Sequence, residues 1–354
     1  MPWVDFSGLA LWQNTLVFVL AAVVIWIAGS RLTIYADAIV ENTNLGAAFV
    51  GVVFLAVATS LPEIGRTITA AAIGNAPLAV DSLFGGVVLQ TAVLAIADLT
   101  VTTRPLTYFA PQPVLLLQGV VVVLLLGLAL AGIAAGELAH IFNVGLWTIV
   151  LFGAYGYFLY ALRHYETRER WRPVDVPDEL RDRAFAPGGG RAGIPGPRPL
   201  RGVAIRFGIS SAVIFVAGVV LAEVGNALAG QTGLGSGFVG ATLLAFASAL
   251  PEMSTTIAAV RIGAYSLAVA NIFGTNAFLV ALLLLADVFY RQGPVLEAVS
   301  ASATFTAAAG IVATSVYLVG MLERRNAVVL GMGVDSLIVL LIYAATVVVL
   351  YLLR

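Results

Sequence analysis

The sequence contains two closely similar segments, ATSLPE at residues 58–63 and ASALPE at residues 247–252. A second pair follows them in the same register, LAVDSLFGG from Leu78 and LAVANIFGT from Leu267. At a constant offset of 189 residues, 26 of the 56 positions from Thr43 to Asp98 are identical to their partners. Identity of this extent in one register, without a gap, indicates an internal repeat.

The composition is that of an integral membrane protein, because 60% of the residues are hydrophobic and only 10% are charged. A helix needs roughly 20 apolar residues to cross the hydrocarbon core of a bilayer. The first apolar run has no basic stretch before it and no cleavage site after it, so we expect it to be retained. Runs of suitable length lie at 12–35, 46–72, 76–98, 112–134, 142–164, 203–228, 236–261, 265–288, 296–320 and 327–353. The sequence therefore predicts an all-α membrane protein with ten transmembrane helices.

One hydrophilic segment, about residues 163–206, divides these runs five and five. It is rich in arginine and proline, contains three consecutive glycines and lacks the apolar content to bury a core, so we expect a flexible linker. The predicted domains are a first five-helix repeat at 1–165, a linker at 166–201 and a second five-helix repeat at 202–354. The most similar parts of the two repeats span about 43–98 and 232–287.

The arginines predict the orientation of the helices, since all 18 basic residues are arginine and basic loops stay in the cytoplasm. With the linker in the cytoplasm, 15 arginines fall on that side, Arg291 and Arg354 fall outside, and Arg66 lies within the membrane. Both termini are then outside. Because each half has an odd number of spans, the second half enters the membrane from the opposite side. We therefore expect inverted repeats in the plasma membrane, an architecture typical of secondary transporters.

Each copy of the motif places a proline inside an apolar run. Pro62 and Pro251 cannot donate to the carbonyl four residues back, so the carbonyls of Ala58 and Ala247 lose their helical partners. In lipid a freed carbonyl needs another partner, and a cation can serve. A plain structural kink is the alternative interpretation.

A glutamate follows each proline near the bilayer midplane, where a charged side chain costs at least roughly 2.5 kcal/mol. On helical spacing, Glu63 and Glu252 each have hydroxyls one turn away on the same face. Those hydroxyls belong to Thr59, Thr67, Ser248 and Thr256. An all-oxygen surface suits hard cations such as calcium, sodium and potassium, whereas zinc and copper prefer Cys or His. The alternative is a pair of protonated carboxyls that hold helices together.

The second repeated block adds polar residues in the next helix of each half. Ser82 and Asn271 occupy equivalent positions, and a glycine follows three residues later in each copy, at Gly85 and Gly274. Small residues let helices approach closely. We therefore expect Ser82 and Asn271 to reach the two glutamates in a four-helix site, to which Asn276 adds polar atoms.

These segments resemble the signatures of the calcium/cation antiporter superfamily, G-T-S-x-P-E and G-N-x-x-G-S-N, which mark two inverted alpha-repeats. ATSLPE and ASALPE match the first signature, and ANIFGTN from Ala270 to Asn276 matches the second. The resemblance implies a sodium/calcium exchanger-like fold, with calcium as the transported ion, sodium or protons as the counter-ion, and no other cofactor. The ligands that it implies are Glu63, Glu252, Thr59, Ser60, Ser248, Ser82 and Asn271.

Several charged residues lie outside these signatures. Arg66 follows Glu63 by one helical turn. We expect its guanidinium either to pair with Glu63 or Asp81, or to extend to the membrane interface. A pair with Glu63 would lower the affinity for divalent ions. Asp98 and Asp287 repeat as well, but both fall at predicted helix ends, where we expect solvated acids.

The resulting prediction is a secondary active cation antiporter whose partners are the lipid bilayer and small inorganic cations, not nucleic acid. The chain has no cysteine, and His140 and His164 lie at predicted helix ends, so the sequence does not indicate an enzyme. The open alternatives are a transport-inactive protein or a monovalent-cation/proton exchanger of the same fold, and a cation channel, which would conduct without a counter-ion.

Overall fold

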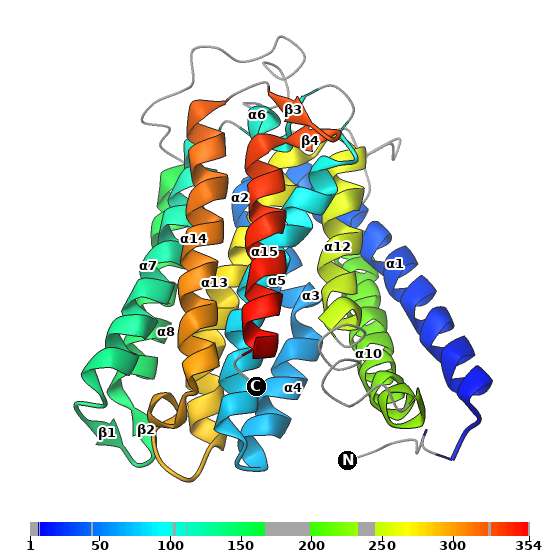
Figure 1. The fold of residues 1–354 in the computed structure, drawn as a ribbon. Coiled ribbons are helices and arrows are strands. Elements are labelled where there is room, and N and C mark those ends of the chain that lie inside the picture. The colour runs from blue at the N-terminus through cyan, green and yellow to red at the C-terminus, as the bar shows by residue number, and fades with distance from the viewer. Residues whose placement is uncertain are drawn as a thin grey trace.

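The protein, represented by a computed structural model, is an all-α bundle (Figure 1). The structure describes residues 6, 8–43, 45–101, 104–110, 112–166, 199–232, 245–324 and 327–352. Within them, eight helices are long and apolar enough to cross a membrane. They are α1 (Leu11–Asn42), α5 (Ala76–Asp98), α7 (Pro113–Ala135), α8 (Leu146–Glu166), α10 (Leu200–Thr232), α13 (Tyr265–Phe289), α14 (Ala301–Glu323) and α15 (Val334–Leu352).

A ninth span is broken at the first motif. Its parts are α2 (Ala47–Val50), the π-helical turn η1 (Gly51–Leu55), α3 (Ala56–Thr59) and α4 (Leu61–Ala72). The helix bends by 53° at Ser60. Pro62 lies in the first turn of α4, where its missing N–H costs no helical hydrogen bond. The predicted break at Pro62 is confirmed.

The second motif behaves differently, because α12 (Ala245–Arg261) continues through Pro251 without interruption. With 17 residues, α12 is shorter than a full span. The remainder of the predicted seventh run, up to residue 244, lies outside the described residues. The described part of the chain therefore supports eight spans, or nine with the bent helix, and the tenth stays a prediction.

Short elements close both ends of the bundle. A helical turn follows each central helix, α6 (Leu106–Phe109) and η3 (Val295–Ala298). Strand β1 (His140–Ile141) pairs with β2 (Val144–Gly145), and β3 (Val328–Val329) pairs with β4 (Met332–Gly333), both antiparallel. The two hairpins have the same register, and each precedes the last helix of its half. They lie at opposite ends of the molecule (Figure 1).

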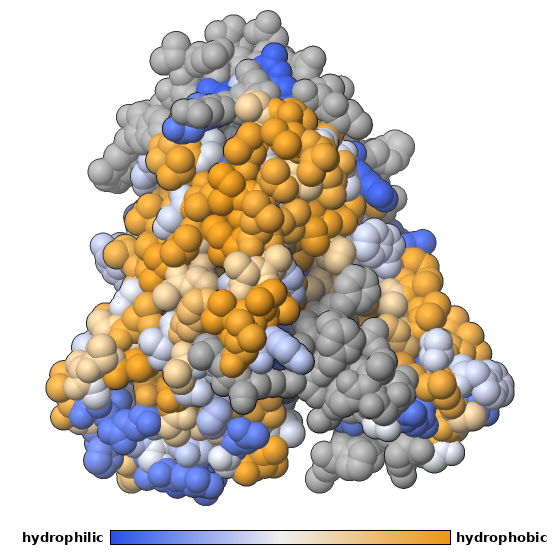
Figure 2. All heavy atoms as spheres, viewed as in Figure 1, coloured by the Kyte–Doolittle hydropathy of each residue, from blue (hydrophilic) through white to orange (hydrophobic). Residues whose placement is uncertain are grey.

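The core lies around the two helices of the second repeated block. Within an 18-residue apolar stretch of each helix, 72% of the residues are buried in α13 and 67% in α5, but only 17% in α15. The outer helices instead present apolar side chains outward. Figure 2 shows these side chains across the middle of the visible face, with hydrophilic residues gathered towards its ends. This distribution matches a protein surrounded by lipid, with its polar ends in water.

Glycine permits close backbone contact between α13 and η1. A Cβ atom added at Gly274 would lie 2.6 Å from the Cα of Val52, and one at Gly51 would lie 2.7 Å from the Cβ of Ala270. The predicted close approach is therefore confirmed at Gly274. It is wrong for Gly85, around which the described residues leave open space.

Helices α1 and α10 pack against each other and against the motif helices of the opposite half. Gly29 of α1 faces Ser254 on α12, and Gly218 of α10 faces the ring of Pro62. These two glycines are themselves 189 residues apart. Each half therefore packs its first long helix, α1 or α10, against the motif helix of the other half.

Asp287 does not lie in solvent as expected from its place at a helix end. It is 0% exposed and accepts hydrogen bonds from the N–H of Val295 at 2.6 Å, the N–H of Gly145 at 2.7 Å and the hydroxyl of Thr148 at 2.6 Å. The last two donors belong to the first half of the chain. Asp287 therefore joins the end of α13 to the hairpin of the other repeat.

Asp98 makes the equivalent link from the end of α5 to the hairpin of the second half. It does not lie in solvent, so the expectation of a solvated acid is wrong here too. It is 1% exposed and accepts from the N–H groups of Leu106 and Gly333. Leu106 starts α6 in the same half, whereas Gly333 ends the hairpin of the other half. A buried carboxylate satisfied by several donors is stable without water, which explains why an acid at a helix end can be buried.

Candidate cation-binding site

Glu63 and Glu252 are brought together from the two halves of the chain. They are 4% and 0% exposed, and their carboxyl groups act on each other electrostatically. Glu63 lies in the first turn of α4, directly after the bend, and Glu252 lies within α12. Among the described residues, Oε2 of Glu63 and both carboxyl oxygens of Glu252 have no hydrogen-bond partner. Buried acceptors without donors are candidate positions for a bound cation or proton.

The hydroxyls of the bend lie beside this pair. Thr59 is buried next to the Glu252 carboxyl, and its hydroxyl donates to the carbonyls of Leu55 and Ala56 at 3.2 and 3.1 Å. Ser60 is also buried and donates to Ala56 at 2.8 Å. Since the backbone takes their protons, these hydroxyls offer lone pairs, which are what a cation requires.

Four further residues lie on the helices of the two glutamates: Ala58, Ser248, Ala247 and Thr67. Ala58 is buried in α3, and Ser248 is half-buried in α12, one turn before Glu252. The carbonyl of Ala247 cannot receive a helical hydrogen bond from Pro251, which has no N–H. Thr67 is buried in α4, and its hydroxyl has no partner among the described residues.

Asn271 contacts the motif helix of its own half. Its amide Nδ2 donates to the hydroxyls of Thr255 and Thr256 on α12, at 3.1 and 3.3 Å. The buried Oδ1 atom has no partner among the described residues. Ser82, its counterpart in α5, is half-buried and donates to the carbonyl of Ala79 within its own helix at 2.9 Å. Thus Asn271 reaches the helix of Glu252, whereas the hydroxyl of Ser82 bonds within its own helix.

Asn276 has a role that sequence reasoning missed. Its Nδ2 donates to the hydroxyl of Thr91 at 3.0 Å, and this bond joins α13 to α5. Both side chains are fully buried. Thr91 has no equivalent in the second copy, where Val280 stands, so the repeat offered no signal for it.

Asp81 is bonded to the start of α14. Its carboxylate accepts from the hydroxyls of Ser300 and Ser302 at the start of α14, at 2.8 and 2.9 Å. The charge of Arg66 acts on the Glu63 carboxyl and on that of Glu252. The predicted pairing of Arg66 with Glu63 or Asp81 stays a prediction, and electrostatically the arginine acts on the glutamate pair.

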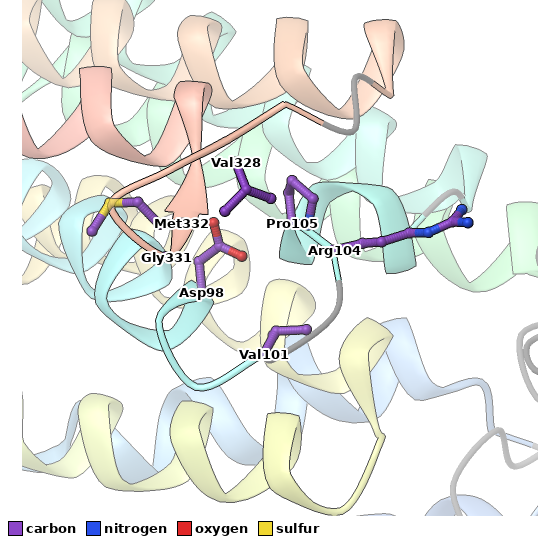
Figure 3. Close-up of a pocket in the computed structure, with 7 residues that line it drawn as sticks. All are labelled: Asp98, Val101, Arg104, Pro105, Val328, Gly331 and Met332. Atoms are coloured by element: carbon purple, nitrogen blue, oxygen red, sulfur yellow. The ribbon is translucent and has the colours of Figure 1, made fainter.

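A cavity of about 230 Å³ lies elsewhere, at the end of α5 (Figure 3). Both carboxyl oxygens of Asp98, which borders it, already accept backbone N–H groups. The side chain of Arg104 extends away from the other lining residues (Figure 3). Its full lining is Asp98, Val101, Arg104, Pro105, Val328, Gly331 and Met332. This cavity therefore offers no free carboxylate to a cation.

Two carboxylates are few for a permanently bound metal ion. Within the part of the chain that the structure describes, no three residues of the His, Cys, Asp and Glu types gather to hold a metal ion. Two carboxylates, with neutral oxygens around them, fit an ion that is bound and released more readily than one held permanently.

Known proteins share both sequence and fold with this chain. The chain is 24% identical over 266 residues to the putative antiporter CaxA of Alkalimonas amylolytica, covering 74% of this chain and 76% of the relative. It is 25% identical over 275 residues to the inner membrane protein YrbG of Escherichia coli K12, covering 76% and 78%. A solved structure of the sodium-calcium exchanger NCX_Mj has a TM-score of 0.70 at 14% identity, covering 95% of this chain and 98% of the exchanger.

The family model for the sodium/calcium exchanger protein matches residues 13–163 and 203–352, which are nearly all of both halves. This match agrees with the bent motif helix, the apolar spans and the shared fold described above. Members of this family are transporters, not enzymes. The chain belongs to the sodium/calcium exchanger protein family.

Proposed function

We propose that this protein is a secondary active cation antiporter whose exchanged ions share one site between Glu63 and Glu252. The observation that carries the proposal is the meeting of these two buried carboxyls from opposite halves, with three of their four oxygens unpartnered among the described residues. Thr59, Ser60 and the free Oδ1 of Asn271 are the nearby oxygen ligands that we assign.

We infer that the two halves are inverted repeats. The equivalent hairpins lie at opposite ends of the molecule (Figure 1), and Asp98 and Asp287 make reciprocal joints to them. Helix α1 begins, and α15 ends, towards the same end (Figure 1). This arrangement supports both termini on one side of the plasma membrane, and the arginine distribution favours the outside for them and the cytoplasm for the linker. Inverted halves around a midplane site are common in transporters that work by alternating access.

Competition for the shared carboxylates couples the two ions. When one ion occupies the site, the other cannot bind, because the described part of the chain places no further carboxylate group beside the pair. An empty pocket with two charges is costly to close off from water in a low-dielectric interior. The carrier should therefore change sides only when it is loaded, and this condition gives exchange, not leak.

The proposal also concerns which ions are exchanged. Calcium exchanged for sodium or protons is the first candidate, because the matched family and the matched solved structure are named for sodium and calcium. A monovalent-cation/proton exchanger of the same fold is the second candidate, and Arg66 beside the pair is the observation in its favour.

Flux into proteoliposomes tests the proposal. We expect radioactive calcium or sodium to enter only against an imposed gradient of the other ion or of protons. Glu63→Gln and Glu252→Gln should each abolish this exchange, whereas Glu223→Gln, a change at an exposed glutamate in α10, should preserve it. Exchange that survives in both motif variants would refute the site, and uptake that needs no counter-ion would indicate a channel.

A further inference from the structure

Arg66 borders the buried face of α4. On that face Glu63, Thr67 and Ala70 are all nearly inaccessible. Arg66 is half-buried and follows Glu63 by three residues. Side chains at this spacing on a helix start about 5–6 Å apart at their Cβ atoms. The side chains of Arg66 and Glu63 therefore start close together by backbone geometry alone.

Within the part of the chain that the structure describes, no hydrogen bond of Arg66 points to another role. Asp81, the one other acid that the sequence offered as its partner, is held by two serines of α14. The Nε atom of Arg66 is buried and has no hydrogen-bond partner among the described residues. Its charge acts on the carboxyls of Glu63 and Glu252.

The second copy shows what a neutral residue does at this position. Thr255, the equivalent of Arg66, donates to the carbonyl of Pro251 at 2.9 Å and accepts from the amide of Asn271 at 3.1 Å. A hydroxyl there completes the packing of α12 against α13 without adding charge. Arginine in the first copy instead adds a full positive charge that no physiological pH removes.

We propose that Arg66 is a fixed counter-charge of the two-glutamate site, which favours one monovalent cation or proton at a time and weakens the binding of calcium. This inference rests on the proposed function, because it assumes that ions bind between Glu63 and Glu252. It assigns a specificity-determining role to Arg66.

Charge balance gives the physical reason. Two ionised carboxylates and one guanidinium leave one net negative charge, which a single sodium ion, potassium ion or proton neutralises. A calcium ion would leave one net positive charge in a buried site, where uncompensated charge is strongly disfavoured. The guanidinium also repels a divalent ion twice as strongly as a monovalent ion at the same distance.

Cation affinity in the purified full-length protein tests this assignment. The variants are Arg66→Thr, which installs the residue of the second copy, Arg66→Gln, which removes the charge but keeps a long polar side chain, and Arg66→Lys, which keeps the charge. Arg261→Thr removes an exposed arginine at the end of α12 and is the matched control. Calcium chloride and sodium chloride are titrated by calorimetry, and folding is checked by size-exclusion chromatography.

We expect Arg66→Thr and Arg66→Gln to gain at least tenfold in calcium affinity, while Arg66→Lys and Arg261→Thr stay within twofold of the wild type. The gain should disappear when Glu63→Gln is added. If either neutral variant folds and binds calcium no more tightly than the wild type, while Glu63→Gln still abolishes sodium exchange, the inference is overturned and the proposed function survives. If exchange survives in both Glu63→Gln and Glu252→Gln, the proposed two-glutamate site itself fails.

Discussion

Asp287, which links the end of α13 to the hairpin of the first half, is expected to contribute strongly to the stability of the protein. Asp287 is fully buried and takes three hydrogen bonds, from Val295, Gly145 and Thr148, between 2.6 and 2.7 Å. Hydrogen bonds to a charged group contribute about 1.5–3 kcal/mol each. Replacing the carboxylate by an amide puts an NH₂ group against a donor and weakens the remaining bonds.

We expect Asp287→Asn to lower the free energy of unfolding by about 3 kcal/mol, the loss of one to two charge-assisted bonds. Asp287→Ala leaves three donors without an acceptor, at about 1–3 kcal/mol each, so it should cost about 5 kcal/mol. Thr148→Val removes only one donor, and the carboxylate keeps two. This change should cost about 2 kcal/mol, the loss of one hydrogen bond to a charged group.

The assay is thermal unfolding of the detergent-solubilised protein, followed by fluorescence-detected size-exclusion chromatography. Glu297→Gln, at an exposed acid of η3 in the same loop region, is the control and should behave like the wild type. Asp98→Asn should reproduce the loss seen for Asp287→Asn, because its carboxylate makes the same cross-repeat contact. If Asp287→Ala were as stable as the wild type, or Thr148→Val as damaging as Asp287→Ala, the reasoning about the joint would be refuted.

Two further predictions use the same assay. Gly274→Ala should destabilise the protein by about 2 kcal/mol, because the new methyl would meet the backbone of Val52 at 2.6 Å, whereas Gly85→Ala enters open space and should be neutral or stabilising by up to about 1 kcal/mol. Equal effects of the two changes would contradict the packing. Thr91→Val removes the acceptor of the buried Asn276 amide and should cost about 1–2 kcal/mol, and an unchanged melting temperature would show that this bond does not stabilise the protein.

The sequence predicts the helices well because lipid imposes strong rules on them. Every backbone group in the hydrocarbon must be paired within the chain, so long apolar runs become helices. The starts of α5 and α13 are each within one residue of the predicted start. The break at Pro62 was also predictable, since proline cannot continue the hydrogen-bond ladder. Pro251 shows the limit of that rule, because α12 continues through it.

The partners of the polar side chains were much harder to predict. Arg66 had two acids within plausible reach, and only the position of α14 showed that Asp81 bonds to serines 219 and 221 residues away. Asn276 bonds to Thr91 across 185 residues. Such contacts depend on how helices pack in space, and helical periodicity carries no information about which helix lies opposite.

Hydropathy and repetition are properties of the chain alone, so they were enough to predict two similar halves with five apolar runs each and equivalent apolar surroundings for Glu63 and Glu252. The burial of Asp98 and Asp287 could not be predicted in this way, because it depends on how the helices and hairpins pack in space. A carboxylate can leave water only where enough donors converge on it, and here those donors come from the opposite half of the molecule.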